Sequence, residues 1–410
     1  MDITPIVPEK FHQEFPYLKD TRLDHRLVGY PAILNSFCHC VSSSRLDMYA
    51  SHRNQALVIK RSEFPDIFSG YEKEDGKYTF NSTRRDQDIV ILDLIHRYSD
   101  MPGVPGSATP YITVVYKGLE DNEVGYFNIE KYFLGSDGFG FTYNWGNVGS
   151  LGVGDYVAKD EVIACSPNIK GSEYNIGLNL TTAFISTHEV IEDAMWISRS
   201  AAEAMESEEF RKIIVNISQD VRPLYINGTP DNPKIFPDIG EKIRPDGAVA
   251  AFRNVSTTTC MADTDPSTMH EINLLTDDAI IVRPGGEVVN LEFVVAKPRL
   301  NPAYSQVEKY HKASLDYYRR IYDSYHSKVL NQYRLTPTYN KLVTQAITRL
   351  SGAGIRLPGY NDNIRGRTEY EGMDRQTVEY IQAIITIRRP RKVEVGFKLS
   401  CQSGGRPNVG

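Results

Sequence analysis

The sequence predicts a β-rich α+β fold, and three observations support this prediction. Runs of alternating apolar and polar residues, separated by glycine-containing turns, recur between residues 72 and 300. Residues 301–350 instead carry apolar and aromatic residues at helical spacing. Of the 410 residues, 41% are hydrophobic, which is enough for buried cores, and this length predicts roughly two to three domains.

Charge and cysteine content narrow the class of protein. The net charge of -6 argues against a globally basic nucleic-acid-binding protein, so a polyanion site must be a local basic patch or be completed by a partner. Five scattered cysteines indicate reduced thiols in a cytosolic setting. No apolar run approaches the roughly 20 residues of a membrane span, and the N-terminus lacks the pattern of a signal peptide. We therefore expect a cytoplasmic location and no membrane partner.

The first predicted helix follows a run of three serines. Ser42–Ser44 form a good N-cap cluster, and prolines break any long helix before them. Arg45 stands at the start of this helix, and Gln55 lies further along it. Spacing alone predicts a solvated basic helix.

Residues 72–217 are predicted to form mostly strands. GSDGFGF at residues 135–141 lacks the lysine and hydroxyl of a phosphate-binding loop and predicts a hairpin turn. The adjacent acids Glu192 and Asp193 precede an alanine-rich, helix-forming segment. Such a pair can approach a metal–phosphate centre, or it can serve a helix dipole. Further strands are expected in residues 152–167, 177–185 and 212–218.

The second half of the chain combines a β-type unit with helices. Residues 239–252 repeat the turn-and-strand order of residues 152–164, a unit common in small β-barrels. Tyrosines at helical spacing in residues 301–335 predict a packing face, with stacking on nucleic acid as the alternative. Pro337 is expected to divide this region from a second helix.

The C-terminal stretch combines glycines with cations. A β-type run over residues 378–397 leads into GFKLSCQSGGRPNVG. Its glycines allow a close approach of the backbone to a ligand, and Lys398 and Arg406 stand beside them, so the stretch is a candidate phosphate site. A plain surface turn is the alternative for so short a motif.

Four stretches, taken together and in order, resemble the β subunit of multisubunit DNA-directed RNA polymerases, most closely the split β subunits of large bacteriophages. They are residues 42–72, 154–199, 242–252 and 391–410. Residues that fall on matching positions of the family include Arg45, Met48, Gln55, Gly177, Asn179, Glu192, Asp193, Gly396, Lys398 and Gly404.

The resemblance implies that the chain takes part in nucleotidyl transfer during RNA synthesis. It implies that Arg45 contacts the incoming triphosphate and that Gln55 lies near the 3′ end of the transcript. It also implies a catalytic role for Lys398, close to the RNA 3′ region, and for Arg406, which keeps the charge of a family lysine but not its donor geometry. Such residues would supply the charge neutralisation and positioning that phosphoryl transfer requires.

The metal ions implied by the resemblance are held mainly by another chain. The resemblance assigns Glu192 and Asp193 an indirect role beside the second Mg²⁺. The triple-aspartate loop that holds the catalytic Mg²⁺ belongs to the β′ subunit in the family, and this sequence contains no such loop. Implied partners are β′-type subunits, the remaining β fragments, the DNA template, the RNA transcript and NTPs. We expect no polymerisation from this chain alone.

The resemblance also implies an architecture. A double-psi β-barrel-like core would be built from segments flanking residues 177–217 and 376–410, with a wall or flap module containing helices inserted between them. The absence of the family's N-terminal lobes and C-terminal clamp suggests a divided β subunit or one exon product of an interrupted gene. Alternatives are a structural or virion protein and an inactive nucleic-acid-binding paralogue. The predicted divisions are residues 1–72, 73–217, 218–375 and 376–410.

Overall fold

The computed structural model has a mixed α+β fold that is rich in strands, which confirms the predicted class. No helix among the described residues is long and apolar enough to cross a membrane. The described residues are 29–38, 40–73, 76, 82–98, 109–135, 138–183, 185, 194–218, 220–254, 267–268, 277–296, 304–330, 332–358, 380–402, 404–405 and 408–409.

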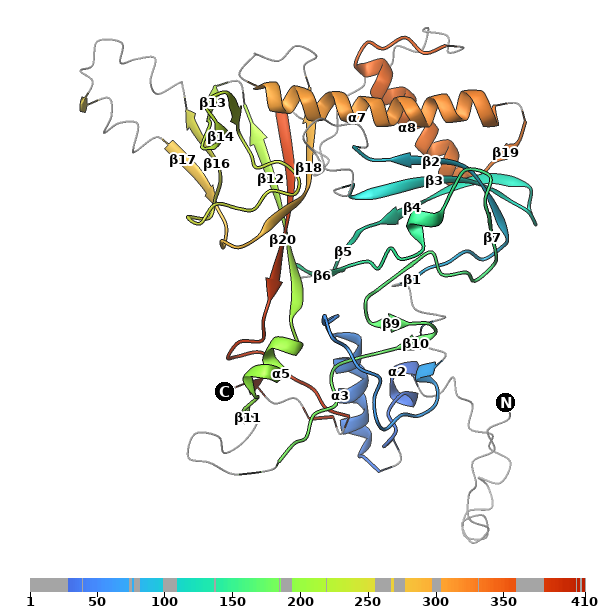
Figure 1. Ribbon diagram of the computed structural model, residues 1–410, viewed down its shortest axis with the longest axis vertical. Coiled ribbons are helices and arrows are strands. Elements are labelled where there is room, and N and C mark those ends of the chain that lie inside the picture. Colours follow the sequence, from blue (N-terminus) through green and yellow to red (C-terminus); the bar gives the residue numbers. More distant parts are fainter. Residues whose placement is uncertain are drawn as a thin grey trace.

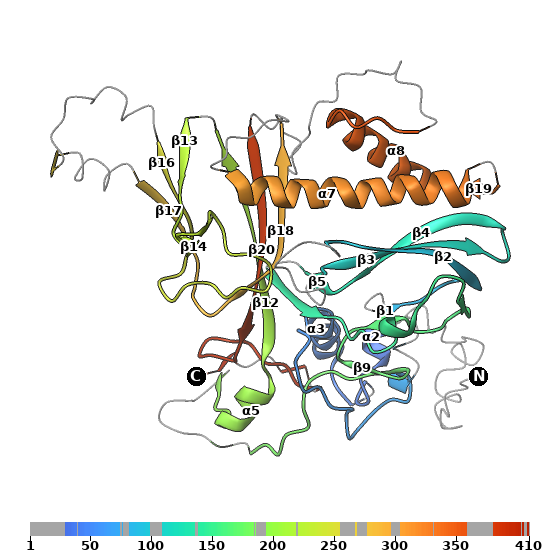
Figure 2. The same cartoon turned by 45° about the horizontal axis from the view of Figure 1, so that its top comes forward.

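One half of the upper body is a five-stranded sheet with two helices across it (Figures 1 and 2). Tyr317 and Ile321 of the first helix and Tyr339 of the second pack against the sheet in one hydrophobic cluster. The tyrosine spacing therefore marks a packing face, as predicted. The strands are β2 (Ile89–His96), β3 (Tyr111–Gly118), β4 (Glu123–Glu130), β7 (Tyr156–Val157) and β19 (Arg334–Leu335), and the helices are α7 (Ser305–Ser324) and α8 (Pro337–Gly352).

The other half of the upper body is a curled half-barrel of two sheets around the largest hydrophobic cluster. Val215, Phe252, Leu291 and Ile385 bring apolar side chains into that cluster from four different strands. One sheet has the order β18 (Glu287–Val295), β20 (Ile381–Arg391), β12 (Ser207–Ile217), β6 (Phe139–Thr142) and β5 (Tyr132–Leu134), and the other has β13 (Val221–Leu224), β16 (Ala248–Asn254) and β17 (Asp277–Ile281).

Below the upper body lies a smaller part that we call the basal lobe, which consists of the described residues of 29–72, 177–206 and 392–409 (Figure 1). Strands β12 and β20 pair antiparallel over their full length and lead down to it. The chain therefore passes from the basal lobe into the sheet at β12 and returns from the sheet to the lobe at β20. Elements of the lobe are α2 (Tyr30–Ile33), α3 (Ser43–Asn54), α5 (Arg199–Ala204), β11 (Ala194–Met195) and β21 (Asn408–Val409).

Short elements complete the chain. The hairpin predicted at residues 135–141 is confirmed, because β5 pairs antiparallel with β6 across it. Pro337 is the first residue of α8, as expected of a proline that divides two helices. The remaining elements are β1 (Ser82–Thr83), β8 (Ala164–Cys165), β9 (Ile169–Lys170), β10 (Glu173–Tyr174), β14 (Asn227–Thr229), β15 (Asn232–Lys234), the 3-10 helix η5 (Val148–Ser150) and the π-helical turn η8 (Tyr325–Val329).

One predicted strand is wrong. The described residues of 177–185 form no strand, although their sequence alternates as a strand does. Their polar groups bond instead to a loop from the first part of the chain: the Glu63 amide donates to the carbonyl of Gly177 at 3.0 Å. The Asn179 side chain also donates to the carbonyl of Phe64 at 2.8 Å. These tertiary contacts outweigh the local pattern.

Candidate functional site

Helix α3 presents a cation at an end that attracts anions. Its N-cap, Ser42, makes no capping hydrogen bond through its side chain, and its first turn contains no acidic residue. The positive end of the helix dipole is therefore not neutralised by a carboxylate of its own first turn. The exposed Arg45 adds a full charge at the same end. This arrangement suits a phosphate group.

The glycine-rich C-terminal loop packs directly against this helix. Gly404 has a φ of 79°, and a Cβ atom there would lie 2.4 Å from the carbonyl oxygen of Arg45. The Arg45 guanidinium also reaches the carbonyl oxygen of Gly404, at 3.5 Å. Glycine is thus required at position 404 both by the left-handed backbone and by the close approach of α3. The close approach that the glycines permit is to another part of the protein.

Polar contacts hold the same loop at three further points. The buried Asn35 donates from its side-chain amide to the carbonyl of Gln402 at 2.8 Å. Gln402 in turn donates to the carbonyl of Ile67 at 3.1 Å. His52 Nδ1 lies 3.1 Å from the hydroxyl of Ser400. The loop is therefore tied to the segment before α3, to α3 itself and to the segment after it.

These contacts fix the direction in which the loop runs along α3. Arg45 lies opposite Gly404 and His52 opposite Ser400, so the loop is antiparallel to the helix. The interval from residue 45 to residue 52 is about 10 Å of helix axis. Lys398 continues the loop toward the C-terminal end of the helix, where Gln55 is the C-cap. Lys398 is exposed and makes no ion pair within the described part of the chain.

The segment that precedes the predicted acidic pair joins the same lobe. The Asn179 amide donates to the Glu63 carboxylate at 3.0 Å, and its side-chain oxygen accepts from the amide of Asp66 at 3.0 Å. Residues 194–195 then pair in parallel with residues 408–409. Parts of three of the four stretches that suggested the polymerase resemblance therefore lie together, and residues 154–165 of the second stretch belong to the upper body. Glu192, Asp193 and Arg406 themselves lie outside the described residues.

The arginines at the end of β20 are paired with carboxylates. Arg389 lies directly across from Glu209 in the β12–β20 register, and their side chains form an ion pair at 2.5 Å. Arg388 bridges Glu208 at 3.4 Å and Glu287 at 3.0 Å. The dense run of cations before Lys398 in the sequence is thus largely neutralised by cross-strand partners.

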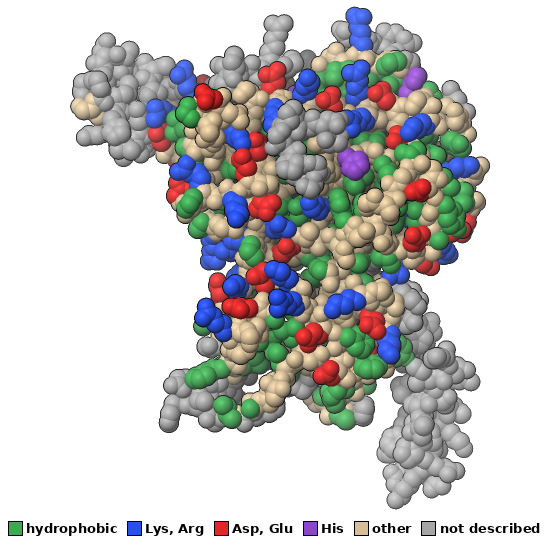
Figure 3. Space-filling model, in the orientation of Figure 1, with side chains coloured by type: hydrophobic (Ala, Val, Ile, Leu, Met, Phe, Trp, Pro, Cys, Tyr) green, Lys and Arg blue, Asp and Glu red, His purple; other side chains and the backbone are tan. Residues whose placement is uncertain are grey.

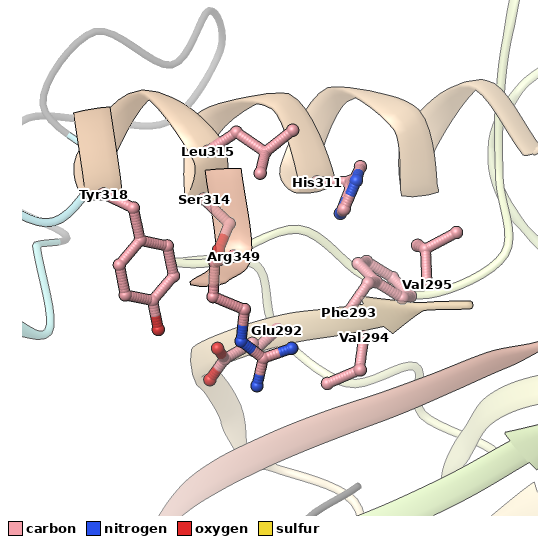
Figure 4. Close-up of a pocket in the computed structure, with 9 residues that line it drawn as sticks. All are labelled: Glu292, Phe293, Val294, Val295, His311, Ser314, Leu315, Tyr318 and Arg349. Carbon is pink, nitrogen blue, oxygen red and sulfur yellow. The ribbon is translucent and has the colours of Figure 1, made fainter. Parts of the chain in front are cut away.

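The structure also contains a cavity away from the basal lobe, between α7, α8 and β18 (Figure 4). Arg349 and Glu292, which lie close to one another, and His311 of α7 are among its lining residues. Burial, and secondarily the charge of Arg349, lower the pKa of His311. The cavity volume of about 20 Å³ has room for roughly one water molecule, so it is too small for a nucleotide.

Sequence reasoning found Arg45, Gln55 and Lys398 but missed the residues that connect them. Asn35 lies outside the four stretches, and His52 and Gln402 lie within them at positions that carried no signal. Their contacts span more than 300 positions of the sequence. Only the glycine at position 404 gave a signal that a close approach occurs there. No model of a known protein family matches the chain, and no curated protein matches it significantly in sequence.

Proposed function

We propose that this protein is a β-type subunit of a multisubunit DNA-directed RNA polymerase, in which it lines the active centre. One observation carries the proposal most strongly: residues 42–72, 177–199 and 392–409, which belong to three stretches that suggested the family, meet in one lobe. If the sequence resemblance were due to chance, these separate segments would not be expected to lie together. If they line one active centre, they must lie together.

Each described candidate residue has a chemical task in this proposal. Arg45, at the uncapped start of α3, contacts the phosphates of the incoming NTP. Lys398 neutralises charge near the RNA 3′ end, and Gln55, at the opposite end of the helix from Arg45, hydrogen-bonds there. In this proposal, the length of helix α3 sets the distance between the residue that contacts the triphosphate and the residue that contacts the transcript.

Mg²⁺ is required by this reaction, and the proposal assigns its main ligands to a partner. Among the described residues, no three His, Cys, Asp or Glu side chains gather where they could hold a metal ion. These residues therefore do not fit a complete Mg²⁺ site. The proposal gives Glu192 and Asp193 an indirect role beside the second Mg²⁺, and Arg406 a role beside Lys398. When bound, Mg²⁺ would stabilise the attacking and leaving oxygens of phosphoryl transfer.

The proposal includes the finer architecture implied by the family. In it, the lower ends of β12 and β20, with the segment that follows, contribute to a double-psi β-barrel. The residues between these strands form the wall or flap insertion. The return of the chain at β20, directly beside β12, supports this idea because an insertion needs entry and exit points that are close together.

The test is RNA extension by the natural complex that contains this chain, with a defined template, NTPs and Mg²⁺. Lys398→Ala is expected to lower the elongation rate at saturating NTP by about 10- to 1,000-fold, as loss of one charge-stabilising group does elsewhere. Arg45→Ala is expected to raise the KM for NTP more than it lowers kcat. Arg199→Ala is the matched control, because Arg199 is exposed in the same lobe and pairs only with Glu203 among the described residues.

The outcomes separate the proposal from its rivals. A complex that extends RNA normally with both Lys398→Ala and Arg45→Ala would refute the assigned residues. A complex that binds nucleic acid but extends no RNA would identify an inactive paralogue. A chain recovered only in assembled particles, without nucleic-acid chemistry, would identify a structural or virion protein.

A further inference from the structure

The basal lobe lacks a hydrophobic core. Six clusters of buried apolar side chains lie in the described part of the chain, and no described residue of the lobe belongs to any of them. Helix α3 buries only Tyr49, whose hydroxyl donates to the carbonyl of Leu34. The lobe is instead held together by the polar contacts described above. A folded unit usually buries an apolar face against another layer, and the described residues of this lobe form no such cluster.

Apolar side chains of the lobe are exposed instead. The lobe contributes nine of the fifteen large apolar side chains that are exposed among the described residues, although it is much the smaller part of the molecule. Trp196 is 63% exposed and Val395 is 78% exposed. In Figure 3, apolar side chains reach the surface of this lower part around α5 and β11. Concentrated apolar exposure of this kind marks an interaction surface.

Part of this surface is an open groove. It has a volume of about 760 Å³. Its lining residues are Trp196, Ile197, Ala202, Val393, Val395 and Val409, and Glu394 is the only charged residue among them. We call this the Trp196 groove. Such composition, an aromatic anchor among aliphatic residues with few charges, is that of the central part of a protein interface.

We infer that the Trp196 groove is the docking site for an apolar, neutral or weakly basic segment of a different protein chain. The lining of the groove decides against nucleic acid as the occupant. It contains one carboxylate, Glu394, and no Lys or Arg that could neutralise a phosphate. An apolar partner segment without acidic residues is complementary to this lining and to Glu394.

A second copy of the same chain fits the groove less well. A symmetric dimer would bring the same patch of both copies together. Two Glu394 carboxylates would then enter one apolar interface, where like charges are costly. That the docked chain is another polymerase subunit rests on the proposed function, whereas the docking surface itself follows from the exposed apolar residues.

The experiment places a photo-reactive benzoylphenylalanine at position 395 of the full-length chain, within its natural complex. Irradiation is expected to link this position to an apolar peptide of a different protein. The same residue at position 281 is the control, because Ile281 is 63% exposed but lies on β17 of the upper body. Val395→Asp is expected to reduce the recovery of that partner at least tenfold, and Ile281→Asp to leave it unchanged.

Three outcomes overturn the inference: a link from position 395 to this chain or to a second copy of it, no link at all, or a partner retained fully by Val395→Asp. The result is separable from the proposed function. A linked partner in a complex that makes no RNA would keep the docking site and refute the polymerase proposal. Active RNA synthesis without any link would do the reverse.

Discussion

Replacement of Gly404 by alanine tests the docking of the C-terminal loop on α3. The added Cβ would lie 2.4 Å from the carbonyl oxygen of Arg45, a distance that real Cβ contacts do not adopt, and 3.1 Å from its carbonyl carbon, which is a tight contact. The left-handed φ of 79° adds about 1–2 kcal/mol of backbone strain. We expect the loop to move away from the helix, because both atoms that it would strike belong to the rigid backbone of α3.

The cost can be estimated from the contacts that are lost. Displacement of the loop would break the hydrogen bonds to Gln402 and Ser400, each with a net value of about 1 kcal/mol. Together with the strain, this amounts to about 3–4 kcal/mol of local destabilisation. Since about 1.4 kcal/mol corresponds to a factor of ten, exchange should accelerate by at least 100-fold at the amides of residues 401 and 404, which donate to the carbonyls of Gly405 and Cys401. The main melting transition should hardly move, because the basal lobe contributes to no hydrophobic cluster.

Hydrogen exchange of the full chain, read by mass spectrometry, measures this effect. Gly396→Ala is the matched control, because Gly396 has a φ of 91° but no atom within 4 Å of the added Cβ. That variant carries the strain without the collision, so exchange near it should accelerate only about 5- to 30-fold. Equal effects of the two substitutions would show that α3 does not approach Gly404 as described.

Two further predictions concern the upper body. Glu292→Gln should lower the free energy of unfolding, measured by denaturant titration, by about 2–3 kcal/mol, because it leaves the fully buried Arg97 without its carboxylate partner. The control Glu203→Gln removes one partner of an exposed ion pair and should lower the free energy of unfolding by less than about 0.5 kcal/mol. Burial and Arg349 lower the pKa of His311 below its ordinary 6.5, so the unfolded chain binds the proton more readily and stability should fall as the pH drops below about 6.5. His311→Gln should flatten this pH dependence, and an unchanged slope would contradict the assignment.

Local pattern predicted those parts of the fold where local and tertiary preferences agree. The tyrosines of α7 repeat at helical spacing because one side of the helix packs on a sheet, so the pattern and the packing have the same cause. The same holds for β12 and β20, whose apolar residues face the core of the half-barrel. Pattern failed at residues 177–185, where Asn179 bonds to a loop that lies over 100 positions earlier.

The candidate site was predictable only in part. A cation beside glycines pointed to Lys398, but the sequence does not reveal that Arg388 and Arg389 meet carboxylates across the β12–β20 ladder. Charge density along a chain differs from charge density on a surface, because partners in space are distant in sequence. The sequence did not predict the Trp196 groove for the same reason, because its lining residues come from two distant segments, 196–202 and 393–409.

The paired strands β12 and β20 also have a mechanical consequence. Their eleven-residue registers are continuous, with apolar partners such as Ile213 and Ile385 in the upper part and ion pairs such as Glu209 and Arg389 in the lower part. This ladder is the paired-strand connection between the half-barrel and the basal lobe. Lys398 follows the end of β20 after only a short segment. The position of Lys398 relative to the half-barrel is therefore set by the direction of these two strands, and a change in that direction would move Lys398 as well.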